Sequence, residues 1–172
     1  YADILNQERY QQPIFYVDSN ISLFVSGIGV NKDFSTLCVN LISDYQLLTN
    51  GQCFPLYYYE ENSESLDLFA SGNGEKYIKQ DGVSDYIFEE CRKKYGKNIS
   101  KEDIFYYVYG VLHDNEYRNR FSSDLKKSLP RIPLVDDVKD FWSLSKAGRA
   151  LADLHINYEK VPAYKGVKVE GL

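Results

Sequence analysis

The chain has 172 residues, 44% hydrophobic and 15% aromatic, which favours one folded domain with a full core. Its formal net charge of −5 counts against a freestanding nucleic-acid binder, which usually carries a basic excess. No apolar run approaches the roughly 20 residues that cross a bilayer, so we expect no membrane contact. Because the chain begins with Tyr1, contains no Met and has no signal peptide, we expect a cytoplasmic piece of a longer polypeptide.

The first sixty residues are predicted to be β-rich. Four segments are short, rich in β-branched and aromatic residues, and separated by Asn, Asp and Gly. They span residues 13–17, 21–30, 35–43 and 53–59. Short links between them favour an antiparallel or mixed sheet. The last segment is apolar on both faces, which is typical of a sandwiched strand, and Pro55 indicates an edge position or the start of the strand.

Residues 61–82 form a polar excursion. The segment is rich in Ser and Gly, and Asn73 and Gly74 form a dipeptide typical of a tight hairpin turn. We expect an exposed loop or a protruding hairpin here.

From residue 83 to residue 160 the hydrophobic period becomes helical. Ser84 and Gly96 have the residue types of a helix N-cap and C-terminal stop, and Ser100 and Asp103 have the spacing of a capping box. Residues 136–159 predict one long helix or two short ones. Strands followed by helices indicate an α+β class.

Between these helices, residues 114–129 are predicted to be helical. Tyr117, Phe121 and Leu125 lie at i, i+4 and i+8, which places Arg118 and Arg120 on the opposite side. The prolines in residues 129–134 predict an extended connector. Residues 161–172 are expected to be a tail of this single domain.

The pair Gly27-x-Gly29 is a candidate phosphate-binding loop. The third glycine of the dinucleotide motif is absent, since position 32 is Lys, and no helical pattern follows immediately. A pair of turn glycines is therefore the better interpretation.

The chain shows no set of residues typical of catalysis or metal binding. Cys38, Cys53 and Cys91 are far apart, and two histidines cannot complete a zinc-ligand pattern, so we expect buried or half-buried free thiols. His113 is predicted near a helix C-terminus and His155 in an apolar helical stretch, and neither has a sequence link to Cys53.

A cluster of basic residues is the strongest local signal for an anion partner. The cluster could neutralise phosphates even on an acidic domain, because binding responds to local potential. The alternative is a solvated helix face with i, i+4 pairs such as Asp114 with Arg118 and Glu116 with Arg120. Lys139 also belongs to this basic half of the chain. The candidate phosphate contacts are Arg118, Arg120, Lys126, Lys127, Arg131, Lys146 and Arg149.

Several long phrases carry a family resemblance. They read "ISLFVSGIGVNKDFSTLCVNLISDYQLL", "GQCFPLYYYEE", "KEDIFYYVYGVLHDNEYRNRF", "DLKKSLPRIPL" and "DFWSLSKAGRALADLHINYE". In this order they resemble the C-terminal specificity region of Type ISP restriction–modification enzymes, and related phrases occur in Type IIG and MmeI-like enzymes. The resemblance covers nearly the whole chain.

The resemblance implies a target recognition domain that positions and reads duplex DNA. The parent enzyme would carry a nuclease, a helicase-like ATPase, a coupler and an adenine methyltransferase upstream, and would use S-adenosylmethionine, ATP and Mg²⁺. No methyltransferase, phosphate-loop or nuclease motif lies in this chain, so we expect no cofactor and no catalysis here. The expected partners are duplex DNA and the upstream methyltransferase and coupler domains. The alternative is a docking module that braces the methyltransferase.

Base readout is expected from loops, because a scaffold can keep its fold while its loops change specificity. Suitable side chains would be presented into the major groove. The excursion over residues 60–82 is one candidate. Arg131 is either a phosphate contact or a buried structural arginine. The remaining readout candidates are Asn31, Lys32, Asp33, Asp44, Tyr45 and Gln46.

Overall fold

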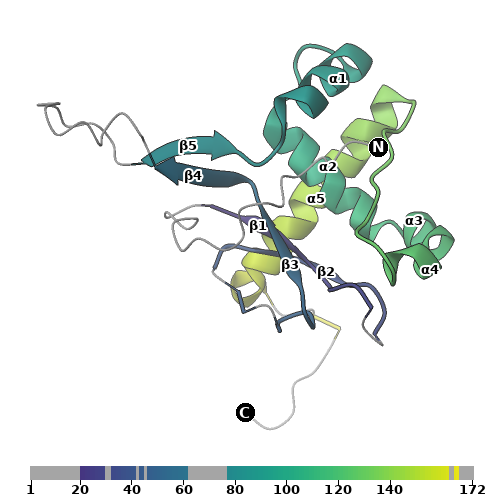
Figure 1. Ribbon diagram of the computed structural model, residues 1–172. Coiled ribbons are helices and arrows are strands. Elements are labelled where there is room, and N and C mark those ends of the chain that lie inside the picture. The colour runs from purple at the N-terminus through teal and green to yellow at the C-terminus, as the bar shows by residue number, and fades with distance from the viewer. Residues whose placement is uncertain are drawn as a thin grey trace, which may run out of the picture.

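The computed structural model describes residues 20–29, 32–41, 43–44, 46–61, 77–162 and 165–166. Strands precede helices along the chain, which confirms the α+β prediction (Figure 1). The strands are β1 (Ser22–Val25), β2 (Thr36–Val39), β3 (Gln52–Pro55), β4 (Tyr57–Glu61) and β5 (Tyr77–Asp81). The helices are α1 (Asp85–Tyr95), α2 (Lys101–His113), α3 (Asn115–Arg120), α4 (Ser122–Leu125) and α5 (Val138–Ile156), followed by the 3-10 helix η3 (Tyr158–Lys160). The predicted strand over residues 13–17 and the turn at Asn73 and Gly74 lie outside the described residues.

The first three strands form an antiparallel sheet in the order β2-β1-β3. Leu23 of β1 lies opposite Cys38 on one side and Phe54 on the other, and all four residues of β1 are buried. β1 is shorter than the predicted segment 21–30 because the chain turns after it. The Gly27 N–H donates to Thr49 O at 3.1 Å. Gly29 lies in the turn at residues 28–29 with a φ of +74°, as the sequence predicts, whereas Gly27 precedes this turn.

The predicted single strand over residues 53–59 is wrong. The chain breaks at Leu56, so β3 is an edge of the three-stranded sheet and β4 belongs to a second, two-stranded sheet. Pro55 lacks an N–H and is the last residue of β3. The Leu56 N–H instead donates to Ile21 O at 2.8 Å, and Leu56 O accepts the Gly82 N–H at 2.7 Å. This exchange of partners directs the chain from one sheet into the other.

β4 and β5 pair as an antiparallel ribbon that projects from the body of the domain (Figure 1). Its innermost register pair is Tyr57 opposite Asp81, and its outermost pair is Glu61 opposite Tyr77. The arms of this ribbon lie at the two ends of the predicted polar excursion.

The helical half is built on the crossing of α2 and α5. Gly110 and Gly148 occupy the crossing, where a Cβ atom on Gly148 would lie 2.0 Å from Tyr106 O. α2 is buried around most of its circumference, including Ile104 and Tyr107. Residues 138–156 form one helix, which decides between the two predicted alternatives. None of the helices in the described part of the chain combines the length and apolar character needed to cross a bilayer.

The predicted caps are present in the structure. The Ser84 side chain accepts the Ile87 N–H at the start of α1, and Gly96 follows its last residue. Ser100 and Asp103 form a complete capping box at the start of α2. These caps satisfy backbone N–H groups that a helix leaves without partners in its first turn.

The predicted helix over residues 114–129 is divided into α3 and α4 at Phe121. The proline-rich connector that follows contains no helix or strand, which agrees with its prolines, and buried tyrosines hold it by its carbonyl groups. The Tyr107 hydroxyl donates to Pro133 O at 2.5 Å, and the Tyr117 hydroxyl donates to Arg131 O at 3.0 Å.

Candidate nucleic-acid interface

The loop between β1 and β2 packs directly against the segment after α4. The Gly29 N–H donates to Lys126 O at 3.0 Å, and the Lys126 ammonium pairs with the Asp33 carboxylate at 2.9 Å. Lys32 is exposed beside Asp33. The structure therefore brings two predicted readout positions next to a predicted phosphate contact.

Arg118 also contacts this loop, which differs from its predicted outward direction. Its guanidinium donates to Phe34 O at 2.5 Å and lies 5.9 Å from the centre of the Phe34 ring. Arg118 is half-buried, while Phe34 is buried. The Asp114 carboxylate, expected as its i, i+4 partner, accepts the Tyr117 N–H and caps α3. Arg118 thus anchors the loop to the helical half.

Two further candidate cations flank these contacts. Arg120 on α3 and Lys127 after α4 are both exposed. The Arg120 guanidinium lies 5.6 Å from the centre of the Phe121 ring. Lys126 is partly neutralised by Asp33, and its hydrogen bond and charge lower the pKa of that carboxyl. We name the following set the loop–helix surface: Lys32, Asp33, Arg118, Arg120, Lys126 and Lys127.

The second readout loop lies beside the first, since Thr49 O accepts the Gly27 N–H. Asp44 and Gln46 are exposed, and the Asp44 carboxylate accepts the Gln46 N–H at 2.7 Å. The Gln46 amide donates to Asn50 Oδ1 at 3.2 Å. The remaining two candidates in these loops, Asn31 and Tyr45, lie outside the described residues.

Arg131 is exposed in the connector rather than buried. It lines a pocket of about 260 Å³ between the connector and the helices α3 and α4. Tyr117, Phe121 and Leu125, the predicted apolar stripe, line the same pocket.

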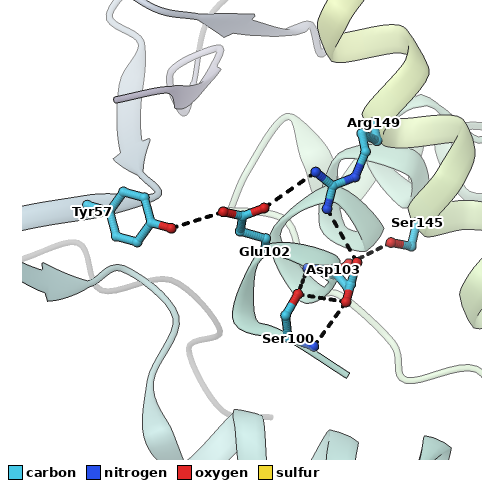
Figure 2. Close-up of polar contacts among 6 residues, drawn as sticks. All are labelled: Tyr57, Ser100, Glu102, Asp103, Ser145 and Arg149. Carbon is cyan, nitrogen blue, oxygen red and sulfur yellow. Dashed lines mark hydrogen bonds and ion pairs between the residues drawn. The ribbon is translucent and has the colours of Figure 1, made fainter. Parts of the chain in front are cut away.

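Arg149 is placed away from the loop–helix surface. Its guanidinium pairs with Glu102 at 3.4 Å and Asp103 at 3.3 Å (Figure 2). It also lies over the Tyr106 ring, 4.1 Å from the ring centre. Glu102 and Asp103 lie in the first turn of α2, whereas Arg118 follows its last turn. A helix of 13 residues is about 20 Å long. The predicted cations therefore form at least two groups, and Lys146 lies exposed on α5 with Arg149.

The base of the β4–β5 ribbon was not singled out by the sequence. The Tyr57 hydroxyl donates to Glu102 Oε1 at 3.1 Å, and burial together with this hydrogen bond raises the pKa of Tyr57 to about 12. The Lys79 ammonium lies 3.4 Å from the centre of the Tyr57 ring. Tyr57 and Glu102 are 45 positions apart, so no local pattern links them.

The cysteines are buried, and the two histidines lie in one aromatic cluster with Tyr109. Cys38, Cys53 and Cys91 are free and buried, as predicted, and burial raises the pKa of Cys38 to about 12. His155 Nδ1 is hydrogen-bonded to the Tyr109 hydroxyl, which also accepts the Cys38 N–H at 2.9 Å. A buried thiol with a raised pKa is a poor nucleophile, because the thiolate is the reactive form.

The comparisons with known proteins agree with these observations. The family model for the Type ISP C-terminal specificity domain matches residues 1–171. No curated protein sequence matches the chain significantly. Among solved structures, the chain is similar to the cryo-electron microscopy structure of a DrdV–DNA complex, with 33% identity and a TM-score of 0.72 over 88% of this chain and 14% of that chain.

Two Type ISP restriction–modification enzymes are also similar. The first is a nuclease-deletion mutant of LlaGI in complex with a DNA substrate mimic, with 35% identity and a TM-score of 0.62, covering 87% of this chain and 11% of that chain. The second is the ATP-dependent enzyme LlaBIII bound to DNA, with 32% identity and a TM-score of 0.68, covering 86% of this chain and 9% of that chain. The chain thus spans a small part of the length of each.

The chain belongs to the Type ISP C-terminal specificity domain family. Its fold, its motif order and its likeness to three solved structures all agree with this membership.

Proposed function

We propose that this chain is a target recognition domain that binds duplex DNA and reads its sequence. The observation that carries the proposal is the family match over residues 1–171. The likeness to three proteins whose structures contain DNA or a DNA mimic supports it. In this proposal the chain has no catalytic role of its own and works in the cytoplasm.

The loop–helix surface supplies phosphate contacts in this proposal. Arg120 and Lys127 are exposed cations on adjoining segments, and among the residues that the structure describes neither side chain has a hydrogen bond or ion pair to lose on approaching a phosphate backbone. Arg118 is less suited, because its guanidinium already holds Phe34 O. Base readout is supplied by the loop at residues 31–33, the loop at residues 44–46 and the β4–β5 ribbon. A two-stranded ribbon is one of the elements that the major groove of B-DNA admits.

The wider protein is also part of the proposal. Upstream nuclease, helicase-like ATPase, coupler and adenine methyltransferase domains would supply the chemistry, with S-adenosylmethionine, ATP and Mg²⁺ as their cofactors. The domain would then place the target adenine for the methyltransferase domain. The net charge of −5 fits a domain that relies on its neighbours for part of the phosphate contact.

The test is a salt titration of DNA binding by the full-length protein that carries this chain. The double variant Arg120→Glu and Lys127→Glu is compared with Lys97→Glu, an exposed lysine in the turn after α1. Each phosphate contact contributes about 0.9 to the slope of log affinity against log salt. We expect the double variant to weaken binding and flatten the slope by about 2, and the control to bind as the unmodified protein does.

A second candidate function is docking onto the methyltransferase, with DNA read elsewhere. The acidic balance and the pocket lined in part by the apolar stripe Tyr117, Phe121 and Leu125 favour it. This alternative predicts that the double variant leaves DNA affinity and the salt slope unchanged. Such a result would exclude the loop–helix surface as a phosphate contact.

A further inference from the structure

Both strands of the ribbon are held at their base by consecutive residues of one helix. Tyr57 of β4 and Asp81 of β5 are directly opposite each other in the register. The Tyr57 hydroxyl donates to Glu102 at 3.1 Å, and the Lys101 ammonium binds Asp81 at 2.8 Å. Lys101 and Glu102 lie in the first turn of α2. Residues of one helical turn therefore bind both members of the innermost pair of the ribbon.

Arg149 extends these polar contacts from α2 to α5. Tyr57 binds Oε1 of Glu102, while Arg149 binds Oε2 of the same carboxylate and also Asp103 (Figure 2). Asp103 is itself held by the Ser100 hydroxyl at 2.6 Å. A continuous chain of polar contacts thus joins β4, the start of α2 and the middle of α5.

Lys101 is less exposed than Glu102, the other α2 residue that binds the base of the ribbon. Its side chain is 18% exposed and binds a second carboxylate, Asp85 of α1, at 2.6 Å. The ribbon is consequently connected to three helices at one point. The carboxylates of these ion pairs are 43% and 89% exposed, and ion pairs open to solvent add little to folding stability, so their main effect here is on geometry.

A small rotation at the base of the ribbon would displace its outer end by a larger amount. From the Tyr57–Asp81 pair to the Glu61–Tyr77 pair it spans four residue steps, or about 13 Å at a rise of about 3.3 Å per residue. A rotation of about 10° at the base would move the outer pair by about 2 Å. A hydrogen bond at 2.9 Å does not survive such a shift. Sequence readout by the ribbon therefore depends on the angle at its base.

Backbone hydrogen bonds also position the base of the ribbon. Leu56 bonds to Ile21, and Gly82 bonds to Leu56, where a Cβ on Gly82 would lie 2.0 Å from Pro55 O. These bonds lie at the inner end of both strands. The Asn20 side chain adds two more there, since its Nδ2 donates to Tyr57 O at 2.7 Å and its Oδ1 accepts the Tyr57 N–H at 3.2 Å. All of these bonds hold the backbone at the base, whereas the contacts to α2 hold the side chains of Tyr57 and Asp81.

We propose that Lys101, Glu102 and Arg149 form a clamp that sets the angle of the β4–β5 ribbon for sequence readout. Arg149 is then a positioning residue and not a phosphate contact. The inference rests on the proposed DNA-reading function.

The experiment selects binding sites from a duplex library with a randomised central segment, using the full-length protein. It compares Tyr57→Phe, which removes one hydroxyl and keeps the ring, with Arg149→Gln. Lys139→Gln on the same helix is the matched control for the loss of one positive charge. For each variant we measure the affinity for the selected duplex, for its single-base-pair variants and for an unrelated duplex, each over a range of salt.

The clamp predicts a loss of discrimination without a loss of general binding. Tyr57→Phe and Arg149→Gln lower the preference for the selected duplex over its single-base-pair variants about tenfold, since one base pair typically accounts for a factor of this order. Their salt slopes and their affinity for the unrelated duplex match those of the unmodified protein and of Lys139→Gln.

Two results overturn the clamp. If both variants discriminate as the unmodified protein does, the contacts of Tyr57 and Arg149 with Glu102 do not set the angle. If Arg149→Gln keeps its discrimination but flattens the salt slope by about 0.9, Arg149 contacts a phosphate. A third result, in which the unmodified protein selects no sequence, overturns the proposed function itself and the clamp with it.

Discussion

Replacing Gly148 by Ala tests the close crossing of α2 and α5. A Cβ atom at this position would lie 2.0 Å from Tyr106 O and 2.7 Å from the Gly110 nitrogen, against an ordinary contact of at least 3.4 Å. Both are backbone atoms, so they cannot swing aside as a side chain can. The helices must separate locally by about 1.4 Å, and overpacking of this kind costs about 1–3 kcal/mol or more.

An opposing effect is the higher helix propensity of Ala, which favours the variant by about 1 kcal/mol. Because two backbone atoms lie under 3.0 Å from the added Cβ, we place the clash at the upper end of that range, about 3 kcal/mol, which leaves a net loss of about 2 kcal/mol. For a protein of this size that lowers the Tm by roughly 4–8 °C. The exposed position Ala147 gives the matched control, because Ala147→Gly measures the propensity effect by itself.

The assay is thermal unfolding followed by circular dichroism, together with the double variant Gly110→Ala and Gly148→Ala. A Cβ on Gly110 would lie 2.2 Å from Leu144 O, at the same crossing. Once one substitution has separated the helices, the second costs less, so the losses should not add. A Tm for Gly148→Ala equal to or above that of the unmodified protein would refute the close crossing.

Two further predictions concern the buried polar cluster between α2, α5 and β2. Tyr109→Phe removes the hydroxyl that binds the Cys38 N–H and His155, so we expect the free energy of unfolding in urea to fall by about 1–3 kcal/mol. The control is Tyr86→Phe at an exposed position, where we expect a loss of less than about 0.5 kcal/mol. Equal losses for the two variants would contradict the role of the Tyr109 hydroxyl. Burial lowers the pKa of His113 to about 4, below its ordinary 6.5, so its contribution to stability is present above pH 6.5 and is lost as the pH falls toward 4. His113→Gln should reduce the difference in stability between pH 7 and pH 4.5 by about 1–2 kcal/mol after allowance for solvent screening, and parallel pH profiles for the two proteins would show that His113 does not titrate in this window.

Local signals predicted the helices well because the residues that start and end a helix are close in sequence. Ser84, Gly96, Ser100 and Asp103 cap helices where their types predicted. The α+β class followed from the change of hydrophobic period, which is also a local property. Strand limits were less certain, since the break at Leu56 depends on Ile21 and Gly82, which are distant in sequence.

At the candidate interface, too, local signals predicted which residues are present, whereas contacts between distant residues were not predicted. The amino-acid sequence by itself indicated which cations and loops were available and, through long ordered phrases, the family to which the chain belongs. Only the tertiary structure decided how those residues are used. In the structure the Arg118 guanidinium donates to Phe34 O, and Arg149 pairs with Glu102 at the other end of α2. The physical reason is that residue type determines charge and hydrogen-bonding capacity, whereas a side chain's partner depends on which distant segments the core packing brings within about 3 Å of it.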